Sequence, residues 1–414
     1  MDASVIAKLM RLNQAFTPGA PVNNADLFAG RLTQMHRIFT ATGQRGFHVV
    51  LFGERGVGKT SLANVASRTF QQHGQIVARV TCDAGDTFTS VWRKALREIT
   101  FNSQRTPAGF ANPSEHLTTP LSEYLPAVAN PDDVRRLLEA AARERPVIVV
   151  LDEFDRIQDR QSATLISDTI KALSDYGVNA TVLIIGVADS VEQLIEGHQS
   201  IERALVQIPM PRMSSDEIRQ ILDKGSQVLG INFNIQAQER IIELAQGVPF
   251  VAHLLGLHSS DAALRAGSEV VNAGYVRLGI EASLDQWHES IKRDYYAATK
   301  SHQPGNIYRE VLLACALAEL DELGCFTPVA VREPLSQILN RDIDIANFAQ
   351  HLKAFCEPDR GPVFVRDGQH RRWRYRFVSP LMRPYVVMRG YVDGLRADGS
   401  SEEERQERSG KLDL

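Results

Sequence analysis

The chain has 414 residues, of which 43% are hydrophobic and 23% are charged. This balance is that of a globular protein; it excludes a fibrous or wholly disordered chain, and the length predicts about two or three domains. The formal net charge of −4 excludes a protein that binds nucleic acid through its overall charge, but it leaves room for a local basic patch.

The sequence also constrains the compartment. No apolar run is long enough to cross a membrane, and the first eight residues, MDASVIAK, lack the apolar core of a secretory signal. We therefore expect a cytoplasmic protein with no membrane contact. The cysteines have no CxxC spacing, and in a reducing compartment they predict buried thiols rather than a zinc site or disulfides: Cys82, Cys315, Cys325 and Cys356.

The first chemical signal along the chain is a glycine-rich segment. Residues 53–60, GERGVGKT, fit the phosphate-loop pattern GxxxxGK[ST], and residues 47–52, FHVVLF, predict a strand before them. Gly56 and Gly58 permit a positive φ, so backbone N–H groups can point at phosphate oxygens. A turn that binds nothing is the alternative, and the strand before the loop with the helix beginning near Ser61 disfavours it.

We therefore expect the whole loop to contact a nucleoside triphosphate. Lys59 would reach the β- and γ-phosphates, and Thr60 would offer its hydroxyl to Mg²⁺. The predicted contacts are Gly53, Glu54, Arg55, Gly56, Val57, Gly58, Lys59, Thr60 and Ser61.

Short apolar strands and helical patterns alternate from residue 47 to about residue 208, which predicts a parallel sheet covered by helices. Residues 102–132 interrupt this pattern, because they are rich in Pro, Ser, Thr and Asn and too long for an ordinary connection. We interpret them as an inserted functional loop or a mobile segment. The predicted strands are residues 49–52, 76–81, 147–151, 181–187 and 204–208.

Two acids follow the third predicted strand, VIVVL. Asp152 at the end of the strand can orient Mg²⁺ through a water molecule, and Glu153 can polarise an attacking water. Apolar strands that end in acids are common, but the coincidence with a phosphate loop favours hydrolysis over binding alone.

Helical patterns replace strands after Pro209. The segment Ser214–Glu217 is a capping box that opens a helix, and further helices carry residues 241–244 and begin near Pro249. Apolar residues spaced four, four, three and four apart predict one longer helix. These residues are Val276, Ile280, Leu284, Trp287 and Ile291.

Three helices and a two-stranded ribbon follow, which is the order of a winged helix-turn-helix. Thr327 can cap a helix whose first residue is Pro328, and residues 343–355 predict the next helix. Strands 363–366 and 372–377 flank DGQH. The predicted domains are therefore a core at 1–209, a helical lid at 210–300, a winged helix at 301–395 and a disordered acidic tail at 396–414.

The ribbon carries the best nucleic-acid signal. Strand alternation predicts Arg372, Arg374 and Arg376 on one face and aromatic residues 373, 375 and 377 on the other. The candidate recognition helix, residues 342–353, is poor in base-reading cations. Contact with the backbone of double-stranded DNA or with a protein effector both fit, ahead of a purely structural wing. The candidate contacts are Arg366, Arg371, Arg372, Arg374 and Arg376.

These motifs resemble those of the AAA+ ATPases, within the branch that holds origin-recognition-type initiators and STAND signalling ATPases. The resemblance rests on the phosphate loop, on LDEFD at 151–155 and on LFAGR at 27–31, which is similar to the motif that lies against adenine. It implies an α/β P-loop AAA+ core with a parallel sheet, a helical lid and a C-terminal winged helix-turn-helix. It also implies ATP as the nucleotide, with Phe28 and Arg31 beside it.

The same resemblance implies residues that complete catalysis. Asp189 would be the polar sensor of the γ-phosphate, with Ser190 or a simple helix cap as alternatives. Arg203 would act on the ATP of a neighbouring subunit, with Arg212 or a solvent-facing arginine as alternatives. This arrangement predicts self-association stimulated by ATP.

The lid departs from initiators, because GVP at 247–249 stands where they carry a sensor arginine. It is similar to the GxP motif of STAND proteins, which implies that Pro249 meets the nucleotide, although Pro is also ordinary in a first helical turn. His253 could face the nucleotide or pack within the lid.

We expect an ATP-hydrolysing switch that controls oligomerisation and engagement of DNA or a protein. The alternatives are a STAND-like signalling or anti-phage ATPase without DNA binding and a plain ATP-gated interaction module.

Overall fold

The computed structural model describes residues 3–21, 28–105, 115–187, 201–301, 303, 305–321, 324–368 and 372–395. The chain divides into two compact units: a core unit, Gly19–Gln220, and a helical unit, Met1–Pro18 with Ile221–Leu414. Among the residues described, none of the helices combines the length and apolar character that crossing a membrane requires.

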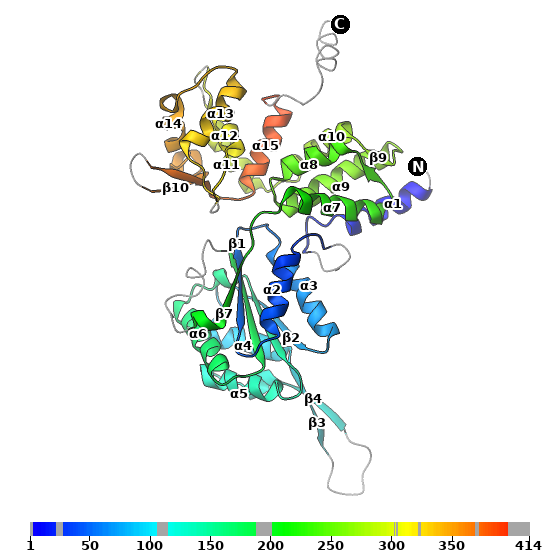
Figure 1. The fold of residues 1–414 in the computed structure, drawn as a ribbon, viewed down its shortest axis with the longest axis vertical. Helices are drawn as coiled ribbons and strands as arrows, with labels where there is room; N and C mark the ends of the chain where they lie inside the picture. Colours follow the sequence, from blue (N-terminus) through cyan, green and yellow to red (C-terminus); the bar gives the residue numbers. More distant parts are fainter. Residues whose placement is uncertain are drawn as a thin grey trace. The chain divides into compact units, whose positions relative to one another are not determined.

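The core unit is built on a five-stranded parallel sheet with the order β2-β5-β6-β1-β7 (Figure 1). The predicted parallel sheet is confirmed, and each strand lies within one residue of its expected ends. The strands are β1 (His48–Gly53), β2 (Ile76–Thr81), β5 (Val147–Asp152), β6 (Ala180–Val187) and β7 (Leu205–Pro209).

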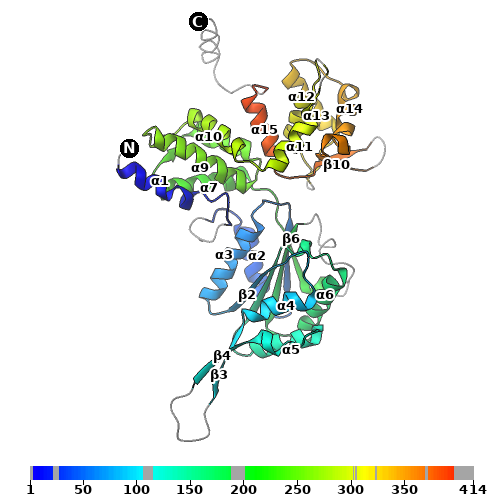
Figure 2. The same ribbon diagram turned by 180° about the vertical axis from the view of Figure 1, so that it is seen from behind.

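Helices cover both faces of this sheet (Figures 1 and 2). On one face, α2 (Leu32–Thr42) and α3 (Lys59–Gln72) bury Ile38, Leu62 and Phe70 against the strands. The other face is covered by three helices whose apolar sides form a second cluster with it: α4 (Phe88–Arg97), α5 (Pro131–Ala141) and α6 (Arg160–Asp175). Burial on both faces explains why the three inner strands, β5, β6 and β1, are nearly continuous apolar runs rather than alternating ones.

Part of the inserted segment is an antiparallel hairpin. Strand β3 (Thr100–Arg105) pairs with β4 (Glu115–Pro120), a 3-10 turn η1 (Leu121–Tyr124) follows, and Figure 1 shows the hairpin extending from the sheet. Residues 106–114 lie outside the described part. The composition at 102–132 predicted a loop here, because its Pro, Asn and Ser content masks any strand alternation.

The helical unit begins with α1 (Ala3–Ala15), which packs on α9 (Pro249–Arg265). Phe16 follows α1 and is fully buried, and a side chain added at Gly225 or Gly256 would overlap its ring. The first 18 residues therefore cluster with the helical unit, whereas the sequence grouped them with the core. The remaining elements before the C-terminal part are α7 (Ser215–Leu229), β8 (Asn232–Phe233), α8 (Ile235–Ala245) and β9 (Val270–Val271).

The prediction of one long helix at residues 276–291 is wrong. Helix α10 (Ala273–Asp285) ends before Trp287, and α11 (Glu289–Thr299) starts a new helix after it. The Trp287 ring packs against two aromatic rings: its centroid lies 5.6 Å from that of Phe250 and 5.7 Å from that of Tyr385. The spacing of apolar residues continues across the break because both helices bury a face in the same unit, and no Gly or Pro marks the interruption.

The C-terminal part confirms the predicted ribbon of two antiparallel strands. Tyr375 and Phe377 are buried, as the strand alternation predicted, and Phe326 forms an isolated bridge to Tyr375. The last helix was not predicted, because its Pro and Gly weaken the helical pattern. The elements are α12 (Tyr308–Leu317), α13 (Pro328–Leu339), α14 (Ile345–Ala354), η5 (Pro358–Arg360), β10 (Phe364–Asp367), β11 (Arg374–Phe377) and α15 (Met382–Val392).

Two buried histidines accept backbone N–H groups and must therefore be neutral. His48 Nδ1 accepts from Val182 at 2.9 Å, and His253 Nδ1 accepts from Thr17 at 3.3 Å. Burial lowers the pKa of His48 from 6.5 to about 3 and that of His253 from 6.5 to about 4. His253 thus packs within the helical unit, one of the two roles expected for it.

These histidines make stability depend on pH. The unfolded chain takes up protons near pH 6.5, whereas the native imidazoles do so only near 3 and 4. Their stabilisation is therefore complete above pH 6.5 and lost as the pH falls toward 4. We expect the free energy of unfolding, measured by urea titration, to fall by about 2 kcal/mol for each buried histidine when the pH is lowered from 7 to 5. His253→Gln should make the free energy of unfolding depend less on pH, and the exposed His288→Gln should not. The same dependence in the wild type and both variants would contradict the assignment.

Candidate nucleotide-binding site

The phosphate loop, residues 53–60, joins β1 to α3. Three of its glycines have positive φ: Gly53 at 150°, Gly56 at 87° and Gly58 at 94°. Helix α3 begins at Lys59, so its first backbone N–H groups have no partner within the helix and face the loop. The loop therefore has the backbone that anion binding requires. Val57 is buried at its centre, whereas Arg55 is exposed.

The side chain of Lys59 is folded over this loop. Its Nζ donates to the carbonyl oxygens of Gly53 at 2.8 Å and Glu54 at 2.7 Å. Burial lowers the pKa of Lys59 to about 8, and the charges of Asp155 and Asp152 oppose that change. A bound triphosphate would give the ammonium an anionic partner in place of these carbonyls and would raise its pKa.

The two residues assigned to Mg²⁺ lie together, although β6 separates β5, which ends at Asp152, from β1, which leads into the loop and α3 with Thr60. Thr60 Oγ1 donates to Asp152 Oδ1 at 3.4 Å, and the backbone N–H of Glu153 donates to the same oxygen at 2.9 Å. Burial raises the pKa of Asp152, and these hydrogen bonds oppose the rise. The described residues hold no cluster of three or more metal-ligating side chains. The Thr60 hydroxyl and the Asp152 carboxylate are oxygen donors that fit Mg²⁺, which takes phosphate and water as its other ligands.

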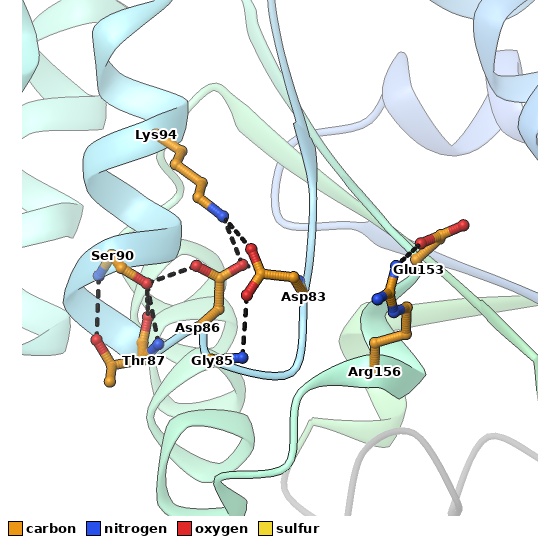
Figure 3. A network of polar contacts seen from close by, with 8 residues as sticks. All are labelled: Asp83, Gly85, Asp86, Thr87, Ser90, Lys94, Glu153 and Arg156. Carbon is orange, nitrogen blue, oxygen red and sulfur yellow. Dashed lines mark hydrogen bonds and ion pairs between the residues drawn. The ribbon is translucent and has the colours of Figure 1, made fainter.

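Glu153 has an unusual backbone and a charged partner. Its φ is 54°, in the left-handed region, and its carboxylate pairs with Arg156 Nη1 at 2.8 Å (Figure 3). Both side chains are about half exposed. This ion pair raises the pKa of Arg156, with a further contribution from the charge of Asp83. The candidate catalytic carboxylate is thus engaged in an ion pair with Arg156.

A second polar network lies beyond the end of β2 (Figure 3). Lys94 Nζ contacts Asp83 at 2.8 Å and Asp86 at 2.7 Å, and the Ser90 hydroxyl donates to Asp86 at 2.7 Å. Thr87 caps α4. Sequence reasoning missed this network and Arg156, because Asp-x-Gly-Asp-Thr after a strand predicts only a turn and a helix cap.

Other expected nucleotide contacts occupy different surroundings. Phe28 is partly buried against the cluster of α2 and α3, and Arg31 donates to backbone carbonyls, so adenine contact stays a prediction for both. Pro249 is the first residue of α9 in the helical unit, and its contact also stays a prediction. Asp189 and Ser190 lie outside the described residues.

The two candidate trans arginines differ in their surroundings. Arg203 lies in the short turn η4 (Glu202–Ala204) and is exposed. Arg212 pairs with Glu54 of its own phosphate loop: its Nε and its Nη2 each lie 2.9 Å from Glu54 Oε2. This pair had no signal in the sequence, since its members are far apart in the chain.

The arginines of the ribbon are only partly available to a partner. Arg366 lies over the Trp373 ring at 4.1 Å, and Arg374 pairs with Asp321 at 3.2 Å and with Asp367 at 3.7 Å. Arg372 is exposed and Arg376 is half-buried; Arg371 lies outside the described residues.

Comparison with known proteins gives one family match. Residues 27–185 match the family model described as "AAA ATPase domain", and this range includes the phosphate loop, Asp152 and Glu153. No curated protein sequence matches the chain significantly.

Several solved structures resemble the chain at low identity. Cdc6p from Pyrobaculum aerophilum is 14% identical with a TM-score of 0.47, over 93% of this chain and 99% of that one. The Walker-type ATPase of Pyrococcus abyssi is 14% identical with a TM-score of 0.49, over 90% and 99%. The Orc1 protein of Aeropyrum pernix, solved in complex with DNA, is 14% identical with a TM-score of 0.45, over 89% and 94%.

The start of the phosphate loop requires glycine. A Cβ on Gly53 would lie 2.5 Å from the carbonyl oxygen of Met210, whereas a Cβ on Gly74, also at positive φ, would meet nothing within 4 Å. We expect Gly53→Ala to cost about 1–3 kcal/mol more unfolding free energy than Gly74→Ala, because only the first adds an overlap to the backbone strain. Urea titration measures the difference, and equal losses would contradict it.

Proposed function

We propose, from the premise that residues 27–185 form an AAA ATPase domain, that this chain is a switch driven by ATP. It binds ATP with Mg²⁺, hydrolyses it slowly, and uses its nucleotide state to control self-association and engagement of a partner. The observation that carries the proposal is the proximity of Thr60 and Asp152, 3.4 Å apart, beside Lys59. A glycine turn without nucleotide chemistry has no need of this triad.

Each residue then has a defined task. The loop N–H groups and the start of α3 would bind the phosphates. The Lys59 ammonium would leave the carbonyl oxygens of Gly53 and Glu54 and contact the phosphate oxygens instead. Thr60 and Asp152 would hold Mg²⁺, which supplies charge neutralisation at phosphoryl oxygens. Glu153 would polarise the attacking water, and for this its carboxylate must separate from Arg156.

Hydrolysis would be completed by a second copy of the chain. Arg203 is exposed, whereas Arg212 is engaged with Glu54 of its own loop. This difference favours Arg203 as the residue that stabilises developing charge on a neighbour's phosphates. ATP binding would thereby be coupled to self-association.

The winged helix would carry the partner contact. The exposed Arg372 supports binding to the backbone of double-stranded DNA, and the stacking of Arg366 on Trp373 stiffens the ribbon beside it. Two aspartates beside Arg374 lower the local positive charge and favour a protein effector instead. The second candidate function is therefore a STAND-like signalling or anti-phage defence ATPase, also cytoplasmic, without direct DNA binding.

The catalytic assignment predicts a separation of binding from chemistry. Lys59→Ala should abolish ATP binding, whereas Glu153→Gln should bind ATP, lose hydrolysis by roughly 100-fold or more, and accumulate as an ATP-dependent assembly on size-exclusion chromatography. Arg203→Ala mixed with Glu153→Gln should regain activity, because one copy supplies the arginine and the other an intact site. A mixture of Arg212→Ala with Glu153→Gln is the matched control. A monomer at all ATP concentrations, or equal rescue by both mixtures, would contradict the shared site.

The DNA assignment predicts a salt dependence. Arg372→Ala should weaken binding to a random double-stranded DNA and reduce the slope of log affinity against log salt by about one, since one phosphate contact is lost. Arg277→Ala on α10, half exposed beside Glu281, is the control and should leave the slope unchanged. Wild-type binding without a salt slope, or no binding, would favour the protein effector.

A further inference from the structure

Arg31 is a buried cation at the edge of the candidate site. Only 2% of its surface is exposed, and its φ of 62° lies in the left-handed region. A buried guanidinium without good partners would be costly, and a left-handed backbone at a non-glycine residue adds strain. The surroundings must therefore hold Arg31 firmly.

The guanidinium of Arg31 joins two segments that are far apart in sequence. Its Nη2 donates to the carbonyl oxygen of Val57, in the middle of the phosphate loop, at 3.0 Å. The same nitrogen donates to the carbonyl oxygen of Pro211, after β7, at 2.6 Å. Nη2 carries two hydrogens, so both are used.

The backbone around Arg31 is anchored to the first turns of α7. The N–H of Arg31 donates to Glu217 Oε1 at 2.9 Å, and the N–H of Gly30 donates to Gln220 Oε1 at 3.0 Å. The other oxygen of Glu217 accepts the N–H of Ser214 at 2.9 Å, which caps α7. One carboxylate thus links the start of this helix to the residue that holds the phosphate loop.

An anion-binding loop must point its N–H groups inward, so its carbonyl groups point outward and need donors. Lys59 covers two of them, at Gly53 and Glu54, and would leave them when phosphate binds. Arg31 covers Val57 through Nη2, and it is held there by the second hydrogen bond of that nitrogen, to Pro211. The loop therefore keeps one fixed support while Lys59 moves.

We propose that Arg31 is a positioning residue of the nucleotide site: it fixes the phosphate loop at Val57 against Pro211 and α7, and it supports phosphate binding without touching the base. This inference rests on the proposed ATP binding. It differs from the expectation that Arg31 lies against adenine, because its effect should be independent of the base.

The test uses the full chain with Mg²⁺ and two ligands, a fluorescent ATP analogue and inorganic tripolyphosphate as its competitor. Arg31→Gln should weaken both by a similar factor, roughly 10–100-fold, since two charge-assisted hydrogen bonds are lost. Arg37→Gln is the matched control, because Arg37 lies on α2, the helix that follows Arg31, and its Nη2 donates to the carbonyl oxygen of Gln207 in β7 at 2.6 Å rather than to the phosphate loop. It should leave both affinities within about twofold.

Each outcome decides the inference. A loss confined to the ATP analogue would show a direct base contact and overturn it, as would unchanged affinities. If Arg31→Gln does not melt cooperatively, Glu217→Ala takes its place, with Ser214→Ala as the control that removes only the other half of the helix cap. Glu217→Ala should weaken both ligands and Ser214→Ala should not; equal effects would overturn it. A wild-type chain that binds neither ligand would instead refute the proposed function.

Discussion

The organisation of the core unit follows from one constraint: a backbone loop that presents its N–H groups to an anion must find donors for its outward carbonyl groups. Here the donors are two cations, Lys59 within α3 and Arg31 before α2. The close approach of Gly53 to Met210 belongs to the same constraint, because the loop can be supported from behind only if the segment after β7 lies against it. The N–H of Met210 also donates to the carbonyl of Phe52 at 2.8 Å.

This constraint explains how a local ligand could have a distant effect. The segment at 210–212 contacts the loop through Arg31 and through the pair of Arg212 with Glu54, and the chain then enters α7 within a few residues. In the proposed switch, a change in the loop would reach the N-terminus of α7 through these short polar contacts as well as through packing. Glu217 is the point where the two paths meet, since it accepts from both Arg31 and Ser214.

The sequence predicted what is encoded locally and missed what depends on tertiary contact. The parallel strands and the phosphate loop were predicted because glycine spacing and apolar runs are local patterns, and Asp152 was placed because it ends such a run. Glu153 and Arg156 are only three residues apart, yet their ion pair forms at a residue with a left-handed backbone, which composition does not encode. The break at Trp287 escaped prediction because both flanking helices keep the same apolar spacing.

The ion pair of Glu153 with Arg156 also bears on the charge balance of the proposed nucleotide site. A triphosphate would bring several negative charges beside Asp152 and Glu153, and like charges at this range repel. Asp152 is buried and has Thr60 and a backbone N–H as partners. Glu153 is half exposed, and its partner is Arg156 (Figure 3). An exposed ion pair contributes little to stability and opens readily. In the proposed mechanism, Arg156 would therefore offset the charge of the Glu153 carboxylate while the nucleotide binds and would release the carboxylate for the chemical step.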